Sequence, residues 1–324
     1  MSEAYIRVEN LKKYFPTKRG MLHAVDDVSF DIHKGETLGL VGESGCGKST
    51  LGRCLIRLLD STSGKVLLKN ADDVGYIDVT KVSAKEMKEL RKRVQIVFQD
   101  PYSCLNPRLS VWELIAEPLI VNSIYSDKNE MRKRIRSLMD TVGLAERLEN
   151  SYPHELDGGR RQRIGIARSL ALNPEFIVLD EPVSALDVCI QAQILNLLNA
   201  LQKEFKYTYV FISHNLSVVR HVSDRIAVMY LGQIVELSDY RELFSKPLHP
   251  YTQALLSAIP LAKLHVQRER IILEGDVPSP IEPPNVCRFA GRCRHATDMC
   301  RTTPPALREI LPGHFAACHY AKEK

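Results

Sequence analysis

Apolar and polar positions alternate in two stretches near the start of the chain, at residues 5–11 and 24–32. A period of two residues is typical of a strand that buries one face and exposes the other. The two stretches therefore predict an antiparallel β-layer in the N-terminal part of the protein.

Longer apolar runs further along predict buried strands at residues 37–41, 176–180 and 209–213. A helix is predicted between the last two strands, at residues 191–204. This strand, helix, strand order is typical of a parallel sheet, so we expect an α/β fold.

The region between the first and second buried strands has a mainly helical pattern. Ser83 and Glu86 have the spacing of a capping box, which predicts a helix to about residue 93 and a strand at 94–98. We therefore expect the α/β core to carry a helical insertion at about residues 101–171. Its segments include 111–119 and 127–142.

A glycine-rich run joins the strand at 37–41 to the start of a helix and fits the pattern G-x-x-x-x-G-K-[ST]. Its residues are Gly42, Glu43, Ser44, Gly45, Cys46, Gly47, Lys48, Ser49 and Thr50. Glycines allow the backbone to approach phosphate oxygens, and the helix start directs its amide dipoles at them. Lys48 can contact the β- and γ-phosphates, and the Ser49 hydroxyl can ligate Mg²⁺. The run predicts a nucleoside triphosphate site.

Composition narrows the class of protein. The chain has 324 residues, so we expect one large domain with an insertion and a smaller second unit. Its net charge is +5 and it contains eight cysteines. Its basic clusters lie among acidic residues, which argues against nucleic-acid binding. No apolar run approaches the roughly 18 residues that span a bilayer, and the first residues begin no signal peptide. We expect a cytosolic protein with reduced thiols that touches a membrane only through a partner.

Four polar residues after predicted strands could act on a triphosphate. Asp180 can hold Mg²⁺, Glu181 can polarise the attacking water, and the Gln99 amide can reach both metal and water. His214 can contact a γ-phosphate through a ring nitrogen. An acidic pair after a strand is common and a single histidine there is more often structural, so each is weak evidence alone.

In their order along the chain, these motifs resemble those of the ATP-binding subunits of ABC transporters over about residues 5–245. The matching positions are the Walker A loop at 42–50, the Q-loop residue Gln99, a signature-like segment at 156–163, the Walker B residues Asp180 and Glu181, a D-loop at 184–187 that includes Asp187, and the switch histidine His214.

The resemblance implies a P-loop ABC ATPase core with an antiparallel β-layer and a helical subdomain. It also implies ATP and Mg²⁺ as cofactors, with Tyr14 stacked on the adenine and Mg²⁺ held by Ser49, Gln99 and Asp180. Glu181, His214 and Gln99 would then take part in hydrolysis. Such subunits work as pairs in which each ATP lies between one chain's Walker A loop and the other chain's signature.

The C-terminal part of the chain indicates a subfamily. Residues 249–256 and 273–280, followed by a cysteine-containing segment, resemble the end of oligopeptide and dipeptide importer ATPases. Residues 45–53 are similar to the second, F-type ATPase of those systems. We therefore expect an ABC ATPase domain at 1–248 and a peptide-importer-type tail at 249–324.

This subfamily resemblance implies several partners. They are a second, non-identical ABC ATPase subunit, two membrane permease subunits and, indirectly, an extracellular peptide-binding protein. It places the chain at the cytoplasmic face of the cell membrane as a peripheral subunit.

The signature departs from the family's usual Leu-Ser-Gly-Gly-Gln. The corresponding residues after Leu156 are Asp157, Gly158, Gly159 and Arg160. An ionised aspartate only accepts hydrogen bonds and brings negative charge towards the partner-bound ATP. Aspartate is also a favoured N-cap that Arg160 can pair with, so the change either weakens the partner-side site or retunes it.

Four of the cysteines, Cys287, Cys293, Cys300 and Cys318, fall within a short C-terminal segment. Clustered thiols in a reducing compartment indicate a metal, and the absence of paired C-x-x-C knuckles suits a [4Fe-4S] cluster at least as well as Zn²⁺. The resemblance to peptide-importer ATPases also implies an iron-sulfur site. Unligated thiols remain an alternative, and a metal here would be structural by default.

Two other functions stay open at this stage. The same machine could move another cargo, such as nickel, an oligosaccharide or a modified peptide. A non-transport ABC ATPase of translation or DNA repair is a more distant alternative, because such proteins tend to have two cassettes or a long coiled-coil insertion. This chain has neither feature.

Overall fold

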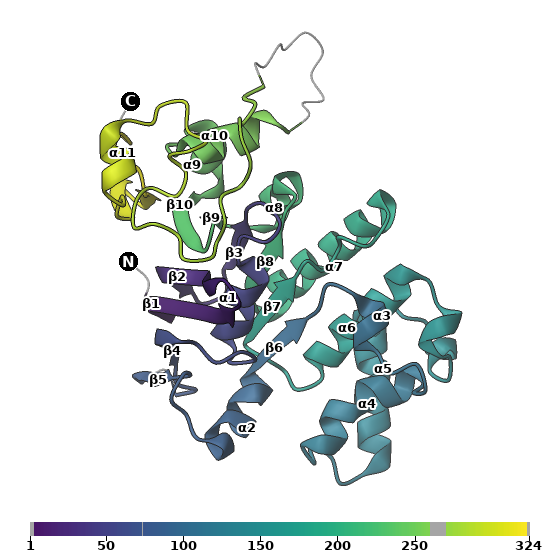
Figure 1. Cartoon of the computed structure of the whole chain (residues 1–324). Helices are drawn as coiled ribbons and strands as arrows, with labels where there is room; N and C mark the ends of the chain where they lie inside the picture. Colours follow the sequence, from purple (N-terminus) through teal and green to yellow (C-terminus); the bar gives the residue numbers. More distant parts are fainter. Residues whose placement is uncertain (1–2, 73, 260–269, 323–324) are drawn as a thin grey trace. The chain divides into compact units, whose positions relative to one another are not determined.

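The chain forms two compact units (Figure 1), and the computed structural model describes residues 3–72, 74–259 and 270–322. The first unit comprises Met1–Lys81 and Phe211–Lys324, and the second comprises Val82–Val210.

The first unit begins with the expected antiparallel layer. Its four strands lie in the order β2-β1-β4-β5, and β1 pairs with both β2 and β4. Buried and less buried positions alternate along parts of β1 and β2, as the sequence pattern indicates. Their bounds are β1(Ala4–Thr17), β2(Gly20–His33), β4(Ser63–Lys69) and β5(Tyr76–Asp78).

A second sheet of the first unit carries the phosphate loop. In this unit its strands follow the order β11-β12-β10-β9-β3, with β3 and β9 parallel and the other neighbours antiparallel. All five residues of β3 are buried, as expected for a central strand. The strands are β3(Thr37–Val41), β9(Arg225–Tyr230), β10(Gln233–Asp239), β11(Arg308–Leu311) and β12(His314–Ala316). The helices of the unit are α1(Lys48–Leu55), α8(Leu216–Val222), α9(Tyr240–Ser245), α10(Pro250–Ser257) and α11(Asp298–Thr302).

The C-terminal strands join this sheet, which the sequence did not predict. Strand β12 pairs with β10, and the carboxylate of Glu236 on β10 is fully buried. This carboxylate accepts hydrogen bonds from the backbone N–H groups of Leu248 and His249, at 2.7 and 2.9 Å, and lies 2.8 Å from Nε2 of His314 on β12. One buried acid therefore ties together β10, the start of α10 and the end of the chain.

The second unit contains the expected helical segments and a parallel strand pair. Strands β6 and β7 pair in parallel, and the predicted capping box of Ser83 and Glu86 is present at the start of α2. The elements are α2(Ala84–Arg93), β6(Val94–Val97), α3(Pro101–Cys104), α4(Val111–Val121), α5(Lys128–Thr141), η1(Glu146–Leu148), η2(Pro153–Glu155), α6(Gly158–Leu170), β7(Phe176–Asp180) and α7(Val188–Phe205). Strand β8(Thr208–Ser213) then leads back to the first unit.

Across the described parts of the chain, no helix combines the length and the apolar character needed to cross a bilayer.

The buried ring of His249 predicts that stability falls in mild acid. Its Nδ1 accepts a hydrogen bond from the N–H of Tyr251, and burial lowers its pKa to about 4 although Glu236 lies nearby. The unfolded chain binds this proton below about pH 6.5 and the folded chain only below about pH 4, so the unfolding free energy should drop by about 3 kcal/mol between those values. Urea titrations of the full chain at pH 7 and pH 4.5 measure this drop.

The matched variant is His249→Asn, because asparagine also caps a helix start but does not titrate. The variant should lose less stability than the parent between the two pH values. An equal loss in both proteins would contradict the assignment to His249.

Candidate functional site

The backbone of the phosphate loop packs directly against two neighbouring strands. A Cβ atom at Gly47 would lie 1.9 Å from the carbonyl oxygen of Ala24, and one at Gly42 would lie 2.1 Å from that of Met229. Both glycines also have positive φ angles, +105° and +155°. Only glycine fits these positions, which explains the spacing of the motif.

Lys48 is folded back over the loop that precedes it. Its side chain is buried, and Nζ donates hydrogen bonds to the carbonyl oxygens of Gly42 and Glu43 at 2.9 and 3.0 Å. Helix α1 begins at this residue without a side-chain cap or an acidic residue in its first turn. A positively polarised helix start beside a lysine and a glycine loop is suited to binding phosphate groups.

Glu43 in the same loop has partners that the sequence did not predict. Its backbone N–H donates to the hydroxyl of Tyr251 on α10 at 2.9 Å. Its carboxylate pairs with Nη1 of Arg292, with N–O distances of 2.9 and 3.2 Å. No local pattern signals these contacts, because Arg292 lies 249 positions further along the chain.

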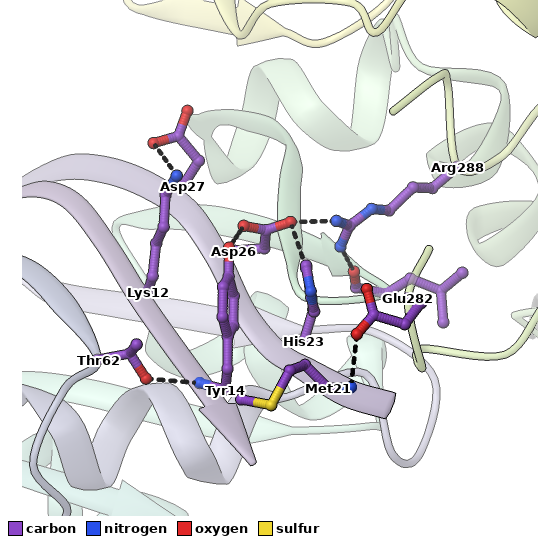
Figure 2. A network of polar contacts seen from close by, with 10 residues as sticks. Lys12, Tyr14, Met21, His23, Asp26, Asp27, Thr62, Glu282 and Arg288 are labelled. Carbon is purple, nitrogen blue, oxygen red and sulfur yellow. Dashed lines mark hydrogen bonds and ion pairs between the residues drawn. The ribbon is translucent and has the colours of Figure 1, made fainter. Parts of the chain in front are cut away.

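Tyr14 lies in a polar network of the β1-β2 hairpin (Figure 2). Its ring stacks on that of His23, with centroids 3.9 Å apart and an interplanar angle of 15°. Its hydroxyl donates to Asp26, which also contacts His23 Nδ1 and the guanidinium of Arg288. Burial raises the pKa of Asp26, but the hydrogen bonds from Tyr14 and His23 and the charge of Arg288 outweigh this and lower it overall.

The pairing of Tyr14 with His23 could have been found from the sequence. The hairpin turn pairs Thr17 with Gly20. Three residues further from the turn on each strand, Tyr14 pairs with His23. The contact of Arg288 with Asp26 had no such signal.

Two of the predicted hydrolytic residues, Gln99 and Glu181, follow paired strands of the second unit. Asp180 ends β7 and is buried, and Glu181 follows it with a positive φ of +48°. Gln99 follows β6, and its amide donates to the Glu181 carboxylate at 3.2 Å. The structure therefore brings the Gln99 amide and the Glu181 carboxylate into direct contact. His214 follows β8 in the first unit and is exposed.

Asp157 caps helix α6, as its sequence position indicates. Its Oδ1 accepts from the N–H of Arg160 at 2.8 Å, and its Oδ2 lies 3.4 Å from the guanidinium of Arg160. The D-loop residue Asp187 caps α7 in the same way, through a 3.0 Å bond from the N–H of Ile190. A Cβ at Gly159 would lie 2.6 Å from Ile190 Cγ2, so the starts of α6 and α7 are packed together.

The four C-terminal cysteines line one cavity of about 980 Å³ in the first unit. They are free thiols, and burial raises the pKa of Cys287 to about 11, with a further contribution from the other three sulfurs nearby. Four thiols facing a shared space are a donor set suited to a thiophilic metal. Within the described residues, no three cysteine, histidine or acidic side chains are already in metal-binding geometry.

The glycine loop, the buried lysine and the uncapped helix start define a P-loop nucleotide-binding protein. Residues 25–184 match the family described as ABC transporter, and residues 235–300 match the one described as oligopeptide/dipeptide transporter, C-terminal region. The chain belongs to the ABC transporter family. The α/β fold class and the resemblance stated from the sequence are thereby confirmed.

Individual relatives match almost the whole chain. The oligopeptide transport ATP-binding protein AppF of Bacillus subtilis (strain 168) is 50% identical over 327 residues, covering 98% of this chain and 97% of the relative. OppF of the same strain is 49% identical over 324 residues, covering 100% and 99%. The dimeric structure of MJ0796, a bacterial ABC transporter cassette, has a TM-score of 0.65 and 31% identity, and covers 73% of this chain and 99% of that one.

The close approach at Gly47 predicts a steep cost for any side chain there. In Gly47→Ala, the positive φ should cost about 1–2 kcal/mol of unfolding free energy and the clash with Ala24 about 1–3 kcal/mol more. Gly45→Ala is the matched control, since its φ is also positive, +79°, but no atom lies within 4 Å of the added Cβ. Urea unfolding of both variants measures the difference. Equal losses of unfolding free energy would show that the loop can shift to accommodate a side chain at position 47.

Proposed function

We propose that this chain binds and hydrolyses ATP as one subunit of an ABC importer of di- and oligopeptides. The match of residues 235–300 to the C-terminal region of oligopeptide/dipeptide transporters carries the assignment of the cargo. The full-length relatives support it, because they are named as oligopeptide transport ATP-binding proteins.

In this proposal the first unit holds the nucleotide. Lys48 and the amides of Gly42 to Thr50 bind the phosphates, Ser49 contributes to the Mg²⁺ site, and Tyr14 stacks on the adenine. Lys48 already lies inside the loop on two carbonyl oxygens, so a bound phosphate would exchange those contacts for charged ones.

The second unit supplies the remaining chemistry of hydrolysis. Asp180 and Gln99 would also hold Mg²⁺, and Glu181 would polarise the attacking water, which the Gln99 amide can reach. The 3.2 Å contact between Gln99 and Glu181 supports this pairing of roles. His214, which belongs to the first unit, would contact the γ-phosphate.

The proposed assembly contains a second, non-identical ABC ATPase and two membrane permeases at the cytoplasmic face of the membrane. An extracellular peptide-binding protein delivers the cargo. Affinity purification of the chain from detergent-solubilised native membranes, under anaerobic conditions and with mass spectrometry, should recover these partners. Recovery of the chain alone, or with ribosomes or DNA, would favour the non-transport ATPase. Permeases accompanied by a nickel- or sugar-binding protein would change the cargo.

The cysteine cavity is proposed to hold a [4Fe-4S] cluster through Cys287, Cys293, Cys300 and Cys318, with Zn²⁺ as the alternative. A bound cation would reverse the raised thiol pKa of Cys287 and link distant parts of a segment with little core of its own. Iron, zinc and acid-labile sulfide are quantified in the same anaerobic preparation. Iron with sulfide is expected, zinc alone would select the alternative, and the absence of all three would overturn the metal proposal.

The charge of Asp157 is proposed to weaken hydrolysis at the ATP that the partner chain holds. A serine at this position would also cap α6, so the helix should form equally well with either residue. What differs is a carboxylate that is about half exposed at the helix start, where it pairs with Arg160. In this proposal it faces the ATP that the partner chain holds. The site built on this chain's own Lys48 and Glu181 is then the better hydrolytic one.

Asp157→Ser should therefore raise ATP turnover of the assembled complex, by up to about twofold if the two sites then contribute equally. Asp157→Asn is the matched control, because it keeps a capping oxygen and removes only the charge. A rise in both variants identifies charge as the cause. Unchanged turnover in Asp157→Ser would contradict the weakening of the partner-side site.

A further inference from the structure

The C-terminal part of the chain touches the candidate nucleotide site at two separate places. Each place is contacted by one short stretch that runs from Cys287 to Cys293, which we name the tail segment, and the phosphate end is contacted by Tyr251 as well. We infer that Arg288 and Arg292 of the tail segment, together with Tyr251, are positioning residues that orient the aromatic end and the phosphate end of the nucleotide site. This inference rests on the proposed binding of ATP.

At the phosphate end, Glu43 is held at three points. Its carbonyl oxygen accepts from Lys48, its N–H donates to Tyr251, and its carboxylate is paired with Arg292. Two of the three contacts come from residues beyond position 248. The path of the loop between Gly42 and Gly47 is therefore fixed partly by the C-terminal region.

Burial makes this ion pair more than a surface contact. The side chain of Arg292 is 9% exposed and that of Glu43 is 27% exposed. Without Arg292, the Glu43 carboxylate would remain as an uncompensated negative charge beside the place where the phosphates bind, and would repel them. Arg292 thus both holds the loop in place and neutralises the Glu43 carboxylate.

The aromatic side chains around Tyr251 hold its hydroxyl in place. Tyr251 packs on Tyr230 of β9 and on Phe289 of the tail segment, with ring centroids 4.7 and 5.5 Å apart. Phe289 also meets Tyr230 edge to face at 5.3 Å. Tyr251 is fully buried, so the hydroxyl that receives the loop N–H has little freedom to move.

At the aromatic end, Arg288 acts through Asp26 (Figure 2). Its guanidinium contacts the Asp26 carboxylate and the carbonyl oxygen of Leu231, and its side chain is 7% exposed. Asp26 in turn accepts from Tyr14, whose ring stacks on His23. Arg288 therefore fixes the acceptor that sets the orientation of the Tyr14 ring.

Arg292 acts at the phosphate end of the nucleotide site and Arg288 acts at the aromatic end. The two variants should therefore respond differently to ligands that occupy different parts of the site. Inorganic tripolyphosphate occupies only the phosphate end, whereas ATP occupies both. Loss of Arg292 should weaken both ligands, and loss of Arg288 should weaken ATP alone. A purely structural role of the tail segment would not separate the ligands in this way.

The measurement is equilibrium binding of ATP and of tripolyphosphate to the full-length chain by titration calorimetry. Arg292→Ala should bind both ligands about tenfold more weakly, because the Glu43 carboxylate loses its partner and repels the phosphates. Arg288→Ala should lose affinity for ATP only. Tyr251→Phe keeps the ring packing, removes only the hydroxyl and should show a smaller loss for both ligands.

The charge-matched control is Arg294→Ala, two positions beyond Arg292. Arg294 is exposed and its Nε contacts the neighbouring His295 rather than a residue of the phosphate loop, so its removal should leave both affinities unchanged. In a Glu43→Gln background the effect of Arg292→Ala should shrink, since Arg292 acts through that carboxylate. Additive losses, or equal affinities of the Arg292→Ala and Arg294→Ala variants, would overturn the inference.

The outcome also separates this inference from the proposed function. If the unmodified chain binds neither ATP nor tripolyphosphate, the proposed function fails. If it binds both and the Arg288 and Arg292 variants bind them equally well, only the positioning roles fail.

Discussion

The contact of the phosphate-loop backbone with β2 and β9 is the constraint on which the rest of the site depends. The carbonyl groups of Ala24 and Met229 occupy the space that side chains at Gly47 and Gly42 would need. The loop therefore packs on these strands through its own backbone, and Lys48 folds back onto its carbonyl oxygens. The same two strands carry Asp26 and Tyr230, which receive the C-terminal region. The geometry of the phosphate loop and the docking of the C-terminal region therefore both depend on the surface formed by β2 and β9.

The two units contribute different kinds of preorganisation. In the first unit, ion pairs with low exposure and a buried aromatic cluster hold the loop and the hairpin. In the second unit, helix caps do this, since Asp157 and Asp187 each fix the first turn of a helix. The close packing of Gly159 against Ile190 then ties those two helix starts to one another.

Local sequence rules predicted the features that depend on neighbouring residues. The β3 strand, the capping box at Ser83 and the Asp157 cap with its Arg160 partner all follow from spacings of five residues or fewer. The pair of Glu43 with Arg292 depends on the folded path of the whole chain, so no periodicity reveals it. The pairing of β12 with β10 was missed because a strand of three residues has too short a pattern to recognise.

The contacts of the C-terminal region bear on whether this ATPase can be divided into independent parts. The motifs of the ABC ATPase core all lie before residue 248. This suggests that the earlier part of the chain could work without the C-terminal region. Yet Tyr251, Arg288 and Arg292 reach back to the loop and the hairpin from beyond that boundary. A chimera that exchanges tails between related importers would therefore carry over part of the donor's nucleotide site together with its C-terminal region.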